Sequence, residues 1–232
     1  MQTKKYQHIF FDLDHTIWDF ETNSALALQV LMTKFNFDEL GFDRDKFIAR
    51  YSYHNSKLWE QLERGLITRA EVKVNRFLFT LNEFNCTNFE LAKAMDTEYL
   101  KLLPLENNLF EGAIEVLEYL QPKYKLHIIT NGFLEVQKQK LKNSNLEKYF
   151  CELITSEEAN ANKPNIEIFN FAFARTQANA DTSIMIGDNP FADMQGALNV
   201  GMDRILFNTM QHKHQIEVTK EIKSLTELIQ FL

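Results

Sequence analysis

Residues 8–16 read HIFFDLDHT, a short apolar run followed by two aspartates that one leucine separates. A run of four to eight residues of this kind is typical of a strand buried on both faces. We therefore predict a strand at residues 8–11 that delivers Asp12 and Asp14 at its carboxyl end. Burying two carboxylates without a partner is costly, so a simple strand-end role for this pair is disfavoured.

Beyond Pro104 the sequence alternates between strand-like and helix-like segments. This alternation predicts an α/β fold with a Rossmann-like parallel sheet and helices on both faces. The last stretch, 212–232, is expected to add an edge strand and a closing helix. The further strands are expected at residues 125–129, 153–154, 183–186 and 204–207, and the helices at 112–120, 134–141, 166–174 and 191–198.

Between these parts, residues 23–103 show a different pattern of apolar residues. Segments 24–35 (SALALQVLMTKF) and 68–84 (TRAEVKVNRFLFTLNEF) repeat apolar residues every three or four positions, which indicates amphipathic helices. We expect an all-helical insertion directly after the first strand. The predicted domains are a core of residues 1–19 and 104–232 and a helical domain of residues 20–103.

The composition of the chain excludes several classes of protein. Of its 232 residues, 45% are hydrophobic and 25% charged, which is ordinary for a folded globular protein. The net charge is −7, and nothing in the sequence requires a basic surface of the kind that binds nucleic acids. We therefore expect no nucleic-acid polymer as a partner. No segment reaches the roughly 20 apolar residues of a membrane span, and no membrane association is expected.

The cysteines and the amino-terminal stretch bear on the compartment. Cys86 and Cys151 form no CxxC pair, and we expect both to be buried structural thiols. The opening MQTKKYQHIF runs into the first strand without an apolar leader. These features predict a cytoplasmic protein, either a monomer or a homodimer.

Four polar segments follow predicted strands or stand beside them: 12–16 (DLDHT), 130–132 (TNG), 163–164 (KP) and 187–193 (GDNPFAD). Ligands of open α/β sheets bind beyond the carboxyl ends of the strands, where these segments would meet. Converging carboxylates repel one another unless a cation is present. Mg²⁺ is the natural cation because it prefers oxygen ligands.

This set of residues suits phosphoryl transfer. A metal and a lysine would neutralise a phosphate monoester, which otherwise resists attack by an anion. One carboxylate could then attack phosphorus, and a second could move the proton of the leaving group and of the attacking water.

The segments FFDLDHT, TNG, KP and GDNPFAD, in this order, resemble motifs one to four of the haloacid dehalogenase-like hydrolases, and the helical insertion resembles the helical cap of that family. The resemblance covers nearly the whole chain. It implies that Asp12 is the nucleophile and a metal ligand, and that Asp14 is the acid/base with its backbone carbonyl on the metal.

The same resemblance implies roles for the later motifs. Thr130 and the backbone around Asn131 would bind the phosphoryl group, and Lys163 would hold the phosphate together with Asp12. Asp188 would bind Mg²⁺, and Asp193 would support the metal site. Each of these segments also has a purely structural interpretation. Residues 130–132 could form an ordinary turn, Lys163 could be a surface lysine, and Asp193 could cap a helix.

His15 stands where the family often has glycine, and its side chain is expected either to contact substrate or cap residues or to fill space. The other histidines are read as structural, and the pair His212 and His214 lacks the neighbouring ligands of a metal motif.

Three longer stretches narrow the resemblance to the branch that hydrolyses pyrimidine nucleoside 5′-monophosphates: HTIWDFETNSALAL, TNGFLEVQKQKL and residues 55–68. The expected partner is a small phosphorylated metabolite. Candidate contacts to the leaving group are Tyr51, Tyr53, His54, Asn55 and Trp59, although each is individually more typical of packing. A phosphatase or phosphomutase acting on sugar phosphates, a phosphonate hydrolase with a cap lysine (Lys57 or Lys73), and a non-catalytic binding protein stay open.

Overall fold

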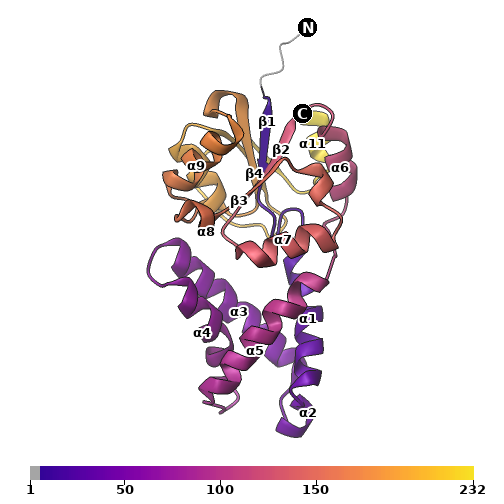
Figure 1. Ribbon diagram of the computed structural model, residues 1–232, viewed down its shortest axis with the longest axis vertical. Coiled ribbons are helices and arrows are strands. Elements are labelled where there is room, and N and C mark those ends of the chain that lie inside the picture. Colours follow the sequence, from indigo (N-terminus) through magenta and orange to yellow (C-terminus); the bar gives the residue numbers. More distant parts are fainter. Residues whose placement is uncertain (1–5) are drawn as a thin grey trace. The chain divides into compact units, whose positions relative to one another are not determined.

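Strand β1 (His8–Phe11) lies inside a six-stranded sheet with the order β3-β2-β1-β4-β5-β6 (Figure 1). Every neighbouring pair of strands is parallel, so the predicted α/β fold with a Rossmann-like core is confirmed. The computed structural model describes residues 6–232. The other strands are β2 (Lys125–Thr130), β3 (Glu152–Thr155), β4 (Ser183–Gly187), β5 (Asp203–Phe207) and β6 (Lys220–Ile222).

The register of the central strands decides which loops meet. Phe11 at the end of β1 pairs with Ile128 in β2 and with Ile186 in β4. The next residue, Asp12, donates its backbone N–H to the Ile186 carbonyl at 2.9 Å. The loops after β1, β2 and β4 therefore begin at the same edge of the sheet.

Helices cover both faces of this sheet, with α9 on one side and α6 on the other (Figure 1). All four residues of β1 are buried, as a strand between two helical layers requires. The helices of this unit are α6 (Ala113–Leu120), α7 (Leu134–Asn143), α8 (Ser156–Ala159), α9 (Ile166–Thr176), α10 (Gly196–Asn199) and α11 (Glu227–Phe231). The 3₁₀ turns of this unit are η2 (Glu147–Tyr149) and η3 (Ala180–Thr182), and η4 (Pro190–Gln195) is a π-helical turn. The 3₁₀ turn η1 (Leu103–Leu105) lies at the end of the helical insertion.

The described chain divides into two compact units. The first comprises the chain up to Phe20 together with Asn107–Leu232, and the second is Glu21–Glu106. The domain boundaries expected from sequence lay at 19/20 and 103/104. The carboxyl-side change falls later because η1 continues the helical unit beyond its last α-helix.

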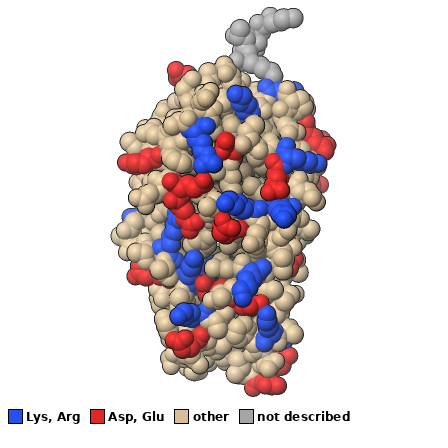
Figure 2. Space-filling model, in the orientation of Figure 1, with Lys and Arg blue, Asp and Glu red and all other residues tan. Residues whose placement is uncertain are grey.

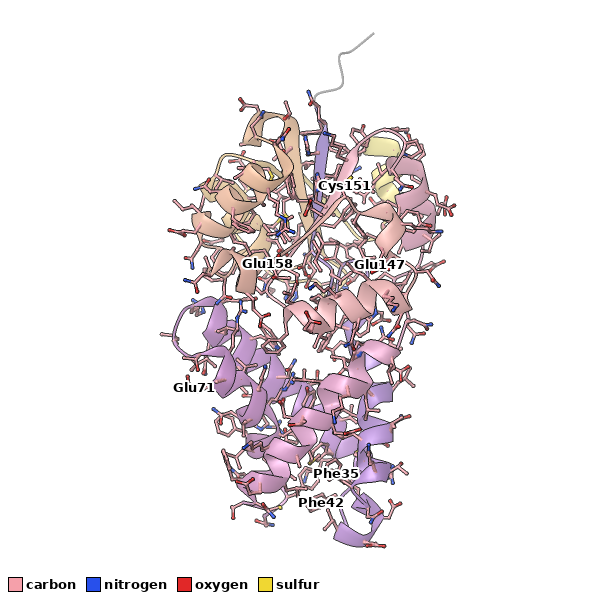
Figure 3. All side chains as sticks on the ribbon, viewed as in Figure 1. Phe35, Phe42, Glu71, Glu147, Cys151 and Glu158 are labelled. Carbon is pink, nitrogen blue, oxygen red and sulfur yellow. The ribbon has the colours of Figure 1, made fainter. Side chains whose placement is uncertain are left out.

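The second unit is built from helices whose ends are set by local capping. Asp43 caps α3 by accepting from the Lys46 N–H, and Thr68 forms a capping box with Glu71 (labelled in Figure 3) at the start of α4. Each cap satisfies backbone N–H groups that the first helical turn leaves free. The helices are α1 (Phe20–Lys34), α2 (Phe37–Leu40), α3 (Arg44–Glu63), α4 (Arg69–Asn82) and α5 (Phe89–Leu102).

Two expectations were wrong in detail. Cys86 is only half-buried and Cys151 is exposed (Figure 3), because each precedes a helix or strand rather than lying within its apolar face. The helix expected at 191–198 is a π-helical turn followed by the short helix α10. The first five residues of the amino-terminal stretch lie outside the described part of the chain.

The charges are distributed without a single-sign face in the view of Figure 2, where acidic and basic side chains are interspersed. Among residues 6–232, no helix combines the length and the apolar character that crossing a bilayer requires.

Candidate active site

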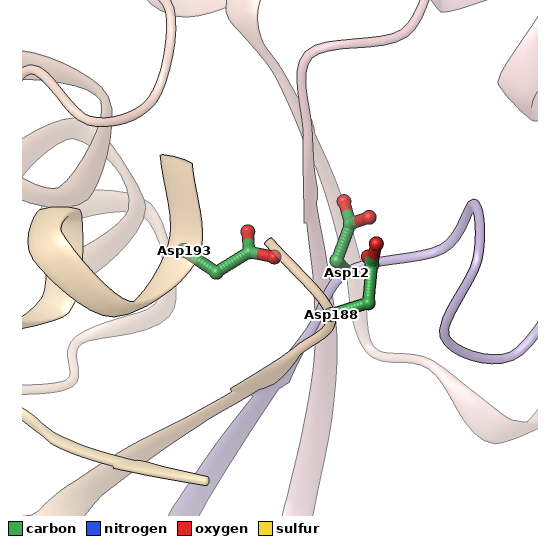
Figure 4. Close-up of side chains that lie close together, drawn as sticks. All are labelled: Asp12, Asp188 and Asp193. Carbon is green, nitrogen blue, oxygen red and sulfur yellow. The ribbon is translucent and has the colours of Figure 1, made fainter. Parts of the chain in front are cut away.

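Three aspartates converge at the carboxyl edge of the sheet (Figure 4). Asp12 follows β1, Asp188 follows β4, and Asp193 lies on the π-helical turn η4. One carboxylate oxygen from each lies within 4.8 Å of the others. Ionised carboxylates this close repel one another, so the cluster needs positive charge to be stable in that form.

Lys163 supplies part of that charge from the loop before α9. Its Nζ donates to Asp12 Oδ1 at 2.6 Å, to Asp193 Oδ1 at 2.6 Å and to the Ile129 carbonyl at 2.8 Å. The lysine is 2% exposed, so these three acceptors replace water around its ammonium group. Three negative charges against one positive charge still leave the cluster anionic.

The electrostatic balance appears in the pKa values of the group. Burial raises the pKa of Asp12 well above its ordinary value, Lys163 opposes this, and the neighbouring Asp193 and Asp188 raise it further. Burial and Asp193 likewise raise the pKa of Asp188. Burial alone would lower the pKa of Lys163, but Asp12 and Asp193 outweigh it and raise the pKa above its usual range. The site therefore holds a firmly charged lysine beside three carboxylates whose combined negative charge exceeds its own.

These residues fit a divalent metal ion. The donors are hard carboxylate oxygens, which Mg²⁺ prefers, and they form a cluster with excess negative charge in which Asp12 and Asp193 are buried and Asp188 is half-buried. The hydroxyl of Thr16, which is fully buried, donates to Asp188 Oδ1 at 3.2 Å and orients that carboxylate. Sequence reasoning assigned Thr16 no role, although it stands in the quoted first motif.

The geometry of Asp193 explains a glycine in the fourth motif. Its Oδ2 accepts the backbone N–H of Asn189 at 3.1 Å while its Oδ1 accepts from Lys163. A Cβ placed on Gly187 would overlap the Asp193 carboxylate. Residue 187 must therefore be glycine for the π-helical turn to bring this carboxylate against the end of β4.

Thr130, the last residue of β2, carries a hydroxyl whose oxygen already accepts two hydrogen bonds. Thr130 Oγ1 accepts from the Gly132 N–H at 3.0 Å and from Gln137 Nε2 at 2.8 Å. Its own hydrogen is thereby left as the donor for a ligand. Asn131 faces elsewhere: its side chain bonds both the N–H and the carbonyl of Lys163, at 2.8 and 3.1 Å, and joins the two loops.

The Asp14 carboxylate is bound by two side chains of one helix. Its Oδ1 accepts from Lys140 Nζ at 2.5 Å, and its Oδ2 accepts from Gln137 Nε2 at 2.8 Å. Both partners lie on α7, within the longer stretch TNGFLEVQKQKL, and sequence reasoning gave neither a role. The only available signal was their three-residue spacing, which places them on one helix face.

His15 adopts a left-handed backbone conformation with φ of 60°, and its ring lies 4.9 Å from that of Phe20. Glycine adopts positive φ without strain, which accounts for the glycine that often stands here in the resembled family. The sequence alone left open whether His15 contacts substrate or cap residues or fills space.

The candidate leaving-group residues of the helical unit have partners within that unit. Tyr51 and Asn55 are buried, and Asn55 Oδ1 accepts from Arg76. His54 bonds Glu83 at 2.7 Å, and Trp59 packs on an apolar cluster. Tyr53 is 49% exposed, with the Arg50 guanidinium over its ring. Packing accounts for Tyr51, Asn55 and Trp59.

Comparison with known proteins places this geometry in context. The chain is 34% identical to the HAD-hydrolase YfnB of Bacillus subtilis, over 99% of this chain and 96% of that protein. It is 31% identical to the pyrimidine 5′-nucleotidase YjjG of Escherichia coli, over 98% of both. A crystal structure of YfnB bound to magnesium superposes with a TM-score of 0.89 at 33% identity and covers 99% of both chains.

A more distant relative is the ribulose-1,5-bisphosphate 5-phosphatase of Halopiger xanaduensis, at 27% identity over 90% of this chain and 87% of that protein. The family model of the haloacid dehalogenase-like hydrolases matches residues 9–207. That range contains every residue of the aspartate cluster, Lys163, Thr130 and the Asp14 contacts. The chain belongs to the haloacid dehalogenase-like hydrolases.

Proposed function

We propose that this protein is a magnesium-dependent phosphatase that hydrolyses small phosphomonoesters through a phospho-aspartate at Asp12. The observation that carries the proposal is the Lys163 ammonium group, which lies 2.6 Å from the Asp12 carboxylate inside an aspartate cluster. A buried cation at this position neutralises an incoming phosphate and keeps the nucleophile oriented. A binding protein would have no use for that arrangement.

In the first half of the reaction, an Asp12 oxygen attacks phosphorus and the bond to the leaving oxygen breaks. Protonated Asp14 gives its proton to that oxygen, and the alcohol leaves. In the second half, ionised Asp14 takes a proton from water, the water oxygen attacks phosphorus, and the bond to Asp12 breaks. The Thr130 hydroxyl and Lys163 donate to the phosphoryl oxygens throughout.

We assign the metal to Asp12, Asp188 and the backbone carbonyl of Asp14, with Asp193 holding Lys163 and the loop in place. When bound, Mg²⁺ supplies charge neutralisation for the transferring phosphoryl group. Support comes from the carboxylate cluster and from YfnB, whose crystal structure contains magnesium.

For the substrate we propose nucleoside 5′-monophosphates, with pyrimidine nucleotides preferred. Support comes from YjjG, a pyrimidine 5′-nucleotidase that aligns over 98% of both chains, including the helical unit. A second candidate is a phosphorylated sugar, because the Halopiger relative is a sugar-bisphosphate phosphatase at lower identity. A phosphomutase of the same fold would use Asp14 in the same way.

The test is hydrolysis of a panel of nucleoside 5′-monophosphates and sugar phosphates by the purified protein, with Mg²⁺ and with EDTA. We expect phosphate release only with Mg²⁺ and the highest kcat/KM on pyrimidine nucleotides. Asp12→Asn should abolish release while retaining the circular dichroism spectrum of the parent. Full activity of Asp12→Asn, or turnover in EDTA, would contradict the mechanism.

A further inference from the structure

Two side chains of α7 donate hydrogen bonds to the carboxylate of Asp14, one to each oxygen. Lys140 Nζ donates to Oδ1 at 2.5 Å and Gln137 Nε2 donates to Oδ2 at 2.8 Å. Donors on both oxygens fix the plane of a carboxylate as well as its position. A side chain that follows a strand end would otherwise rotate among several rotamers.

Lys140 is an unusual lysine in this fold. Its side chain is 2% exposed, although charged side chains on a helix normally reach water. Its ammonium group lies 4.1 Å from the centroid of the Trp18 ring and 5.4 Å from that of Phe20. The aromatic faces attract the cation and hold it in place beside Asp14.

Gln137 is fully buried and links Asp14 to the phosphate-binding loop. Its Nε2 donates to Thr130 Oγ1 as well as to Asp14, both at 2.8 Å. A Cβ on Gly132 would overlap the Gln137 side chain, so this glycine allows the close approach. One amide therefore sets the position of the acid/base relative to the hydroxyl that would hold the phosphoryl group.

We infer that Lys140 and Gln137 are positioning residues for the acid/base Asp14. This inference rests on the proposed function, since it assumes that Asp14 moves protons during phosphoryl transfer. Proton transfer depends steeply on the distance and direction of the acid, so a carboxylate released from its two donors delivers the proton less often.

The choice of leaving group distinguishes a loss of acid/base positioning from a general loss of active structure. A 4-nitrophenolate ion leaves without a proton, whereas the alkoxide of a nucleoside 5′-monophosphate needs one. Loss of the acid/base therefore slows the first half of the reaction for the alkyl ester and spares it for the aryl ester. The second half, which needs Asp14 as a base, slows for both.

The experiment measures the first turnover of 4-nitrophenyl phosphate and of a nucleoside 5′-monophosphate by rapid mixing, with Mg²⁺. For Lys140→Met and Gln137→Met we expect a roughly tenfold to hundredfold loss of first-turnover rate on the nucleotide and less than about threefold on the aryl ester. The aryl ester should give a burst of nitrophenolate followed by slow turnover. Intact mass spectrometry should show the phospho-enzyme accumulating.

Asp14→Asn is the reference variant and should give the same pattern more strongly. Lys142→Met, an exposed lysine on the same helix, is the matched control and should behave as the parent. Lys140→Arg keeps the cation and should recover part of the nucleotide rate. If Lys140→Met does not fold, Gln137→Met decides the question.

Equal losses on the two substrates, or no loss on either, would overturn the positioning role. A parent enzyme that hydrolyses neither ester would overturn the proposed function itself, and the two failures are therefore distinct.

Discussion

The Lys163 Nζ lies as close to Asp193 Oδ1 as it does to Asp12 Oδ1, at 2.6 Å in both cases. One ammonium group thus serves two carboxylates that come from different elements. Asp188, the third member of the cluster, accepts from the neutral Thr16 hydroxyl at 3.2 Å. This imbalance underlies the first two predictions.

Asp188→Asn should stabilise the metal-free protein while removing its response to Mg²⁺. The substitution deletes one of three crowded negative charges, and we expect a gain of about 1 kcal/mol in the free energy of unfolding at neutral pH. Mg²⁺ should raise the melting temperature of the parent, because an ion that binds the folded protein stabilises it against unfolding. The variant should not bind Mg²⁺, so its melting temperature should stay unchanged. A less stable metal-free variant would contradict the account of repulsion.

Asp193→Asn should lower kcat by roughly a hundredfold, because Lys163 loses one of its two carboxylates and its orientation toward Asp12. The overall fold should persist in the circular dichroism spectrum. Asp181→Asn, at an exposed aspartate in the preceding 3₁₀ turn, is the matched control and should keep the parent rate. Parent-like kcat in Asp193→Asn would show that Lys163 needs no second anchor.

Gly187→Ala should reduce activity because its Cβ would displace the Asp193 carboxylate. Gly41→Ala provides a contrast: it has open space around it but a φ of 68°, so it should cost about 1 kcal/mol of stability without changing kcat. Measuring kcat and the melting temperature for both variants separates crowding of the site from backbone strain. Equal kcat in the two variants would refute the crowding argument.

The His8–His127 pair should make the fold sensitive to acid. The two rings are stacked, and His8 Nδ1 lies 3.0 Å from His127 Nε2. Burial, together with His8 and Lys125, lowers the pKa of His127 to about 4. In the unfolded chain this histidine binds a proton near pH 6.5, whereas in the folded protein it stays neutral down to about pH 4. The contribution of the neutral ring to the free energy of unfolding is therefore fully present above pH 6.5 and decreases as the pH falls toward 4.

The loss from this histidine should reach up to about 3 kcal/mol at pH 4. Denaturant unfolding of the parent and of His127→Phe between pH 7.5 and roughly 4 measures it, and the variant should lose less stability over that interval. Parallel pH profiles for the two proteins would rule out His127 as the source.

Local patterns predicted most of the fold. The apolar run at residues 8–11 and the later strand-like runs became parallel strands, because a strand buried on both faces needs little beyond a short apolar segment. The helical insertion was likewise evident from the three- and four-residue apolar spacing. Order along the chain also sufficed to identify the family, since the four motifs occur in the order of that family.

The sequence by itself determined that Asp12, Thr130 and Asp188 stand at strand ends and that Lys163 stands in a loop before a helix. Only the tertiary structure decided their partners. Lys163 meets a carboxylate 151 residues earlier in the chain, and Lys140 meets Asp14 across 126 residues. Such contacts depend on sheet register and on which face of α7 turns inward, which the packing of the whole core sets. A lysine in an ordinary helix pattern therefore gave no sign that it would be buried against an acid.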